Sequence, residues 1–172
     1  MNQESDDFLA VRELLTFGNE FCYFVENQSK YEENYRLTFL QRALPALYLK
    51  GALLPEVTEC DESYMQRYVT EENYEILFNE MREIFGKKDQ FHTADEITGD
   101  LIKHSLSENL CDLYQDMKDL FMTFSKGYEA GRACTAFYAR EWFDKRWGNA
   151  IVKALPIIHE LMSDSSAGPD LE

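Results

Sequence analysis

The sequence is poor in positive charge, with 17 lysine and arginine residues against 32 aspartate and glutamate residues and a formal net charge of −15. A chain with this charge repels the phosphate backbone of nucleic acids and the surface of anionic membranes. We therefore expect neither a nucleic acid nor a membrane as partner. A protein partner is expected instead, and a basic one would fit the charge.

Long apolar runs are also missing. None reaches the roughly 18 residues that a membrane-spanning helix needs, and residues 1–7 have neither the basic nor the apolar region of a signal peptide. The cysteines form no C-x-x-C pair, which is typical of reduced thiols: Cys22, Cys60, Cys111 and Cys134. These absences predict a cytoplasmic protein that is not exported.

Motifs of the common enzyme classes are absent. The three histidines, His92, His104 and His159, lie in no H-E-x-x-H or E-x-x-H motif, so a zinc or di-iron centre is not expected. Neither G-x-S-x-G nor a glycine-rich phosphate loop occurs. The sequence therefore identifies no catalytic residue, predicts no cofactor unless it is Mg²⁺, and favours a protein that is not an enzyme.

Apolar residues at helical spacing dominate what is present. With 172 residues, of which 45% are hydrophobic, the chain can bury the core of one domain. The spacing predicts an all-α antiparallel bundle of about six helices within a single domain, residues 1–162. The helices are expected at residues 5–27, 34–54, 70–85, 105–124, 128–147 and 149–162.

The remaining segments are predicted to be irregular. Residues 87–103 are expected to form a long polar loop. Residues 163–172 are expected to form a disordered tail that ends in two residues from a cloning junction. Pro45 and Pro156 fall inside predicted helices and are expected to kink or break them, because proline removes one backbone donor.

Residues 105–124 combine a strong helical pattern with an acidic face. Ser105 and Glu108 fit a capping box at the start of this helix. Four acids share one arc, away from the apolar stripe: Glu108, Asp112, Asp116 and Asp119. Like charges at this spacing repel one another by about 0.2–0.5 kcal/mol per pair. The face can be a solvated surface, a docking surface for a basic partner or a site for a divalent metal.

The same aspartates can instead lie inside the bundle as halves of ion pairs. Candidate partners are Lys50, Arg140 and Arg146. Breaking a buried pair costs about 3–5 kcal/mol, so Asp116→Asn would then destabilise the protein strongly. On a solvated face the same substitution would be nearly neutral.

The carboxylates on the predicted helices also allow the alternative that the protein is an enzyme. Mg²⁺ takes one or two carboxylates together with substrate phosphates, and carboxylates three or four residues apart on a helix can supply them. The alternative metal ligands are Glu72, Glu75, Asp112 and Asp116. This interpretation predicts a Mg²⁺-dependent hydrolase that acts on a phosphate-containing substrate.

Four stretches carry a resemblance to a known family: residues 44–57 (LPALYLKGALLPEV), 69–72 (VTEE), 112–119 (DLYQDMKD) and 146–148 (RWG). In this order the chain resembles a bacterial family of the Bacteroides type that is recorded only as a domain of unknown function. The resemblance implies an all-helical cytoplasmic protein and no particular activity. A protein-interaction or scaffold module with an acidic face is favoured on other grounds. These are the acidic face itself, the many tyrosines, which suit an interface, and the two proline-interrupted helices, which can shape a groove.

Overall fold

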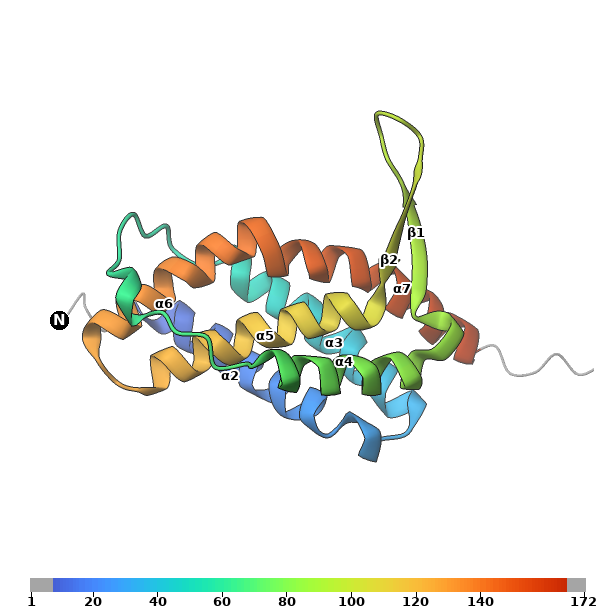
Figure 1. Ribbon diagram of the computed structural model, residues 1–172, viewed down its shortest axis with the longest axis horizontal. Coiled ribbons are helices and arrows are strands. Elements are labelled where there is room, and N and C mark those ends of the chain that lie inside the picture. The colour runs from blue at the N-terminus through green and yellow to red at the C-terminus, as the bar shows by residue number, and fades with distance from the viewer. Residues whose placement is uncertain (1–7, 167–172) are drawn as a thin grey trace, which may run out of the picture.

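Helices make up most of residues 8–166, the part of the chain that the computed structural model describes (Figure 1). The α-helical segments are α2 (Leu9–Glu26), α3 (Glu33–Ala52), α4 (Glu71–Phe85), α5 (Leu106–Ser125), α6 (Glu129–Trp142) and α7 (Gly148–Ser166). Short 3₁₀ turns occupy Gln28–Lys30, Glu62–Tyr64 and Gly86–Lys88. The predicted all-α bundle is thereby confirmed. None of these helices is long and apolar enough to cross a membrane.

The helix starts follow the capping residues in the sequence. Ser105 Oγ accepts a hydrogen bond of 3.1 Å from the backbone N–H of Glu108, as the capping box predicts. Thr70 Oγ1 does the same for Asn73 at 3.2 Å. Asp89, which lies outside α5, also binds the start of this helix, because its buried carboxylate accepts the backbone N–H of Ser107 at 2.7 Å. The start of α5 is therefore held by its own cap and by the preceding turn.

Helix α5 is the central element of the bundle. It packs against α2, α4, α6 and α7, while α3 packs against α2 and α7. Phe124, at the end of the apolar stripe expected from the sequence, is partly buried, and the other residues of that stripe are fully buried: Leu106, Leu110, Leu113, Met117 and Leu120. Because α5 has neighbours on so many sides, polar residues off that stripe are buried too.

The prediction of a polar loop at residues 87–103 is wrong. These residues form a two-stranded antiparallel hairpin, β1 (Gln90–Ala94) with β2 (Leu101–Ser105), which projects from the bundle (Figure 1). Asp95 shapes its turn, because Oδ1 accepts the backbone N–H groups of Ile97 and Thr98 at 2.9 and 2.8 Å. Most residues of the two strands are exposed, so their sequence lacks the alternation of apolar and polar residues from which a strand is predicted.

Helices α6 and α7 are continuous, contrary to the predicted break at Gly148. A π-helical turn, Phe143–Trp147, joins them into one long helix (Figure 1). A side chain at Gly148 would place its Cβ 2.3 Å from the carbonyl oxygen of Phe143, so the turn needs glycine there. Pro45 and Pro156 lie within uninterrupted helices.

Two predictions about the chain ends are affected as well. Helix α7 runs to Ser166, so the tail expected from residue 163 begins with helix. The rest of that tail and the predicted start of the first helix lie outside the described residues.

Candidate functional site

Asp119 is buried and fixes the connection between α3 and α4. Its Oδ1 accepts the backbone N–H groups of Tyr68 and Val69 at 2.7 and 3.1 Å. Its Oδ2 accepts from Arg67 Nη1 at 3.2 Å. The connection has no regular structure around Arg67, and this carboxylate supplies the hydrogen bonds that a helix or sheet would otherwise provide.

Asp116 lies one turn earlier on α5 and is equally buried. Its Oδ1 is 2.7 Å from Arg146 Nη2 and 3.9 Å from Arg67 Nη1. Neither carboxylate oxygen accepts a hydrogen bond of good geometry from residues 8–166. Burial raises the pKa of Asp116 to about 7, because the loss of hydration outweighs the attraction of the two guanidinium groups.

The two arginines share an aromatic neighbour. The guanidinium carbons of Arg67 and Arg146 lie 5.1 and 4.8 Å from the ring centroid of Trp142. A guanidinium is attracted to the face of an aromatic ring, so Trp142 stabilises both charges near the buried aspartates. These contacts join four elements: the connection between α3 and α4, α5, α6 and the π-helical turn. We call the residues that make them the Asp116 cluster: Arg67, Asp116, Asp119, Trp142 and Arg146.

The predicted acidic face is therefore divided. Glu108 and Asp112 are exposed, and Asp112 Oδ1 accepts the hydroxyl of Tyr74 at 2.7 Å. Asp116 and Asp119 are buried in the cluster. Because half of its carboxylates face inward, α5 presents no continuous acidic surface to a partner.

Of the three candidate ion-pair partners, only Arg146 reaches one of these aspartates within residues 8–166. Lys50 Nζ pairs with Glu13 Oε2 at 2.7 Å instead. Arg140 Nε pairs with Asp144 Oδ2 at 3.1 Å, one turn along the same helix. These two assignments are corrected, because each cation has a closer acid that a linear sequence does not reveal.

The alternative metal ligands are not gathered into one site. Glu72 and Glu75 are exposed on α4, whereas Asp116 is in contact with Arg146. Within the described part of the chain, no three histidine, cysteine or acidic side chains are placed to hold a metal ion. The Mg²⁺-dependent hydrolase remains a prediction without a ligand set in the structure.

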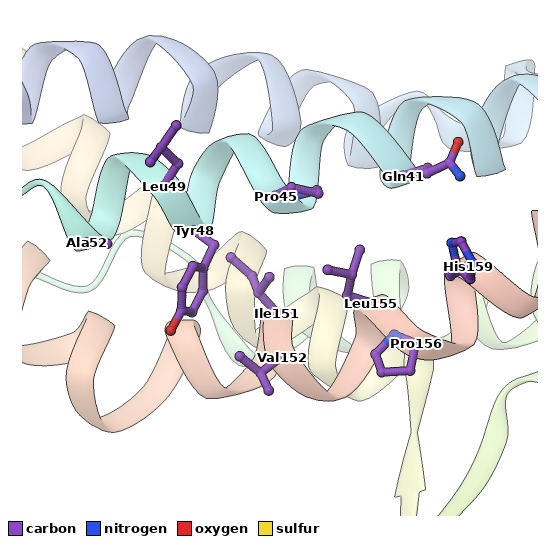
Figure 2. Close-up of a pocket in the computed structure, with 10 residues that line it drawn as sticks. All are labelled: Gln41, Pro45, Tyr48, Leu49, Ala52, Ile151, Val152, Leu155, Pro156 and His159. Carbon is purple, nitrogen blue, oxygen red and sulfur yellow. The ribbon is translucent and has the colours of Figure 1, made fainter.

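An apolar groove, separate from the Asp116 cluster, lies between α3 and α7 (Figure 2). It encloses about 850 Å³, and both helix-interior prolines line it from opposite walls. Gln41 and His159 lie together at one end of the groove (Figure 2). The full lining is Gln41, Pro45, Tyr48, Leu49, Ala52, Ile151, Val152, Leu155, Pro156 and His159. The sequence indicated that the two proline-containing helices can shape a groove, but it did not identify the residues that line it.

A family model described as a domain of unknown function, DUF5063, matches residues 6–164. The chain belongs to the DUF5063 family. A crystal structure of protein BF1032 from Bacteroides fragilis is similar, with 30% sequence identity, a TM-score of 0.79 and coverage of 95% of this chain and 96% of that chain. No curated protein matches the chain. The resemblance predicted from the sequence is thus confirmed.

In this DUF5063 protein, the stretches that carry the resemblance meet in space. Val69, Asp119 and Arg146 come from three of them, and all belong to the Asp116 cluster or contact it. The fourth stretch contributes Gly51, where an added Cβ would lie 2.3 Å from Trp147. The motifs of the DUF5063 chain therefore form one packed region beside both the groove and the π-helical turn.

Proposed function

We propose that this DUF5063 protein is a cytoplasmic protein-interaction module, and that the groove between α3 and α7 binds a helix of its partner. The observation that carries the proposal is the exposure of large apolar side chains on an otherwise acidic protein. Leu49, Val152 and Tyr48 are 57%, 54% and 40% exposed and line one groove. Apolar patches of this kind commonly mark protein-interaction sites.

The distribution of acidic residues along the chain favours an acidic partner for the groove. The two longest stretches of the chain without aspartate or glutamate are residues 34–55 and 145–159. These stretches contain every residue that lines the groove. The lining of the groove therefore contains no carboxylate, so an acidic partner meets less like charge there than over the rest of this acidic chain.

The proposed occupant is an amphipathic helix with an apolar stripe and acidic flanks. Its apolar residues would recur every three to four positions, as in other helix-in-groove complexes. This differs from the basic partner expected from the sequence, which rested on the net charge and on a continuous acidic face of α5. Because Asp116 and Asp119 are buried, that face does not support a basic partner.

Binding of a designed peptide tests the proposal. The probe is a fluorescent helical peptide with leucine on one stripe and glutamate elsewhere, and its affinity is measured by fluorescence polarisation. Leu49→Glu and Val152→Glu place a charge in the groove without touching the core, and each is expected to weaken binding at least tenfold. Burying one such side chain contributes about 1.5–3 kcal/mol, and tenfold in affinity corresponds to about 1.4 kcal/mol.

A matched control separates the groove from general surface effects. Ile76 on α4 is 58% exposed and lies outside the groove, so Ile76→Glu is expected to leave binding unchanged. A peptide with lysine in place of glutamate is expected to bind more weakly. The proposal is overturned if the acidic peptide does not bind or if the lysine peptide binds equally well. It is also overturned if the protein forms a dimer that Leu49→Glu dissociates, because the occupant is then a second copy.

A further inference from the structure

A second hollow, polar in character, lies on the other side of α7. It encloses about 280 Å³ between α5 and the joint of α6 with α7. Its α5 wall consists of Asn109, Asp112 and Asp116, and its opposite wall consists of Lys145, Arg146, Asn149, Ala150 and Lys153. One wall therefore carries the acids and the other the cations. A volume of this size suits a small metabolite rather than a peptide.

Two opposite charges in this pocket remain without an ionic partner. Lys145 pairs with Glu141 at 2.8 Å, and Arg146 pairs with Asp116 at 2.7 Å. Neither Asp112 nor Lys153 forms an ion pair with any residue from 8 to 166, although both line the pocket. The pocket thus offers an uncompensated carboxylate and an uncompensated ammonium that do not reach each other.

The buried Asp116 gives an independent indication of a ligand. It lines the pocket and is fully buried, and although Arg146 Nη2 lies 2.7 Å from its Oδ1, neither oxygen accepts a hydrogen bond of good geometry from the described residues. A buried carboxylate with so few donors is costly, and such groups are rare in folded proteins. A positive charge on a ligand near the α5 wall would lower that cost.

The backbone at the pocket is unusual as well. Lys145 and Arg146 belong to the π-helical turn, and Asn149 follows directly after it. Single π-helical turns within α-helices are frequently found at functional sites, because the extra residue redirects the side chains around it. Here the turn coincides with the cationic wall.

We propose that this polar pocket binds a small zwitterion, a molecule that carries both an ammonium and a carboxylate group, such as a free α-amino acid. The ligand's ammonium donates to the exposed carboxylate of Asp112, on the wall that also holds the buried Asp116. Its carboxylate accepts from Lys153, Arg146 and the side-chain amide of Asn149. Each end of the ligand thus meets the wall of opposite charge, which a simple anion or cation cannot do.

Thermal unfolding with small probes tests this inference. The purified protein is heated with each standard α-amino acid and with β-alanine, and binding constants are measured by calorimetry for those that raise the midpoint. Acetate and methylammonium, which carry only one of the two charges, are the matched probes. At least one zwitterion is expected to raise the midpoint, whereas acetate and methylammonium at the same concentration leave it unchanged.

Variants locate the binding site. Lys153→Ala and Asp112→Asn are each expected to weaken binding of that zwitterion at least tenfold. Lys103→Ala in the hairpin and Glu108→Gln, one turn before Asp112, are exposed controls outside the pocket and are expected to bind as the wild type does. The inference is overturned if no zwitterion binds, if acetate or inorganic phosphate binds as tightly, or if the two pocket variants retain full affinity. None of these outcomes bears on the peptide groove, because Leu49 and Val152 line a separate hollow.

Discussion

Asp116 and Arg146 form a contact of 2.7 Å between the central helix and the π-helical turn, although they are far apart in the sequence. The carboxylate is completely buried, whereas the side chain of Arg146 is 37% exposed. Arg146 therefore connects a buried charge to the surface of the polar pocket.

Removing Asp119 is expected to destabilise the protein. In Asp119→Ala, the backbone N–H groups of Tyr68 and Val69 lose their acceptor, and Arg67 loses its closest carboxylate. Unsatisfied buried donors cost about 1–3 kcal/mol each, so we expect a loss of about 2–4 kcal/mol in the free energy of unfolding. Urea denaturation measures it. Glu108→Gln, exposed on the same helix, should change stability by less than about 0.5 kcal/mol. Equal stability of the two variants would contradict the structure of the connection.

Two glycines within helices are expected to respond differently to alanine. At Gly51 the added Cβ would lie 2.3 Å from Trp147 Cη2 and 2.4 Å from Phe143 Cδ2. Overpacking of this kind costs about 1–3 kcal/mol. At Gly131 the closest atom would be 3.5 Å away, an ordinary contact, and alanine favours a helix by up to about 1 kcal/mol. Thermal midpoints should therefore fall for Gly51→Ala and stay or rise for Gly131→Ala. The opposite order would show that α3 does not approach the π-helical turn this closely.

The helices could be predicted because their determinants are local. The apolar spacing of α5 and the cap at Ser105 are both within a few residues of the structure that they specify. The hairpin could not be predicted, because its strands lie away from the core and lack an apolar face. No local sequence pattern predicts the π-helical turn either. The turn can form because Gly148 has no side chain, and a side chain there would collide with the carbonyl oxygen of Phe143.

The candidate sites depend on tertiary contacts and were only partly predictable. Helical spacing placed Asp116 and Asp119 on one arc, but it could not show which acids the neighbouring helices cover. Arg67 was missed because it lies in a segment without periodicity, and its partner is 52 residues away. Pro45 and Pro156 pointed to the two helices that form the groove, but its lining could not be predicted, because an exposed Leu49 and a buried Leu47 look alike in a sequence. The lack of acids at residues 34–55 and 145–159 was the available signal.

Cys60 and Cys134 are expected to form a disulfide under strong oxidation. Both are free thiols, and their sulfur atoms lie 3.5 Å apart. Burial raises the pKa of both, that of Cys134 to about 12, so few thiolates exist at neutral pH and oxidation should be slow. Diamide can take up the two electrons and two protons that the thiols release. Closing the long loop between them should stabilise the protein by on the order of 4 kcal/mol.

Alkylation and mass spectrometry follow this reaction. After diamide treatment, Cys22 and Cys111 should still be alkylated in denaturant, because both are buried without a nearby thiol. Cys60→Ser should prevent the gain in thermal midpoint. A disulfide that involves Cys22 or Cys111, or full alkylation of all four thiols, would contradict the packing of the connection against α6.

The stability of the protein should depend on pH through Asp116. Its pKa is raised to about 7 in the folded protein, mainly by burial, against about 3.9 for aspartate in an unfolded chain. Between these values the folded protein keeps a proton that the unfolded chain has lost. Stability from this group is therefore complete below about pH 4 and is lost as the pH rises to about 7. The charges that face Asp116 are Arg146 and Arg67, which lower its pKa, and Asp112 and Asp119, which raise it.

The comparison with Asp116→Asn isolates this contribution, because asparagine does not titrate. The substitution should cost more stability at pH 5 than at pH 8, with a difference on the order of a few kcal/mol in urea denaturation. Other titrating groups contribute equally to both proteins and cancel in the difference. If the cost were larger at pH 8, Arg146 would be lowering the pKa of Asp116 below that of an unfolded aspartate. Burial would then be the weaker effect, and Asp116 would be a permanently charged half of an ion pair.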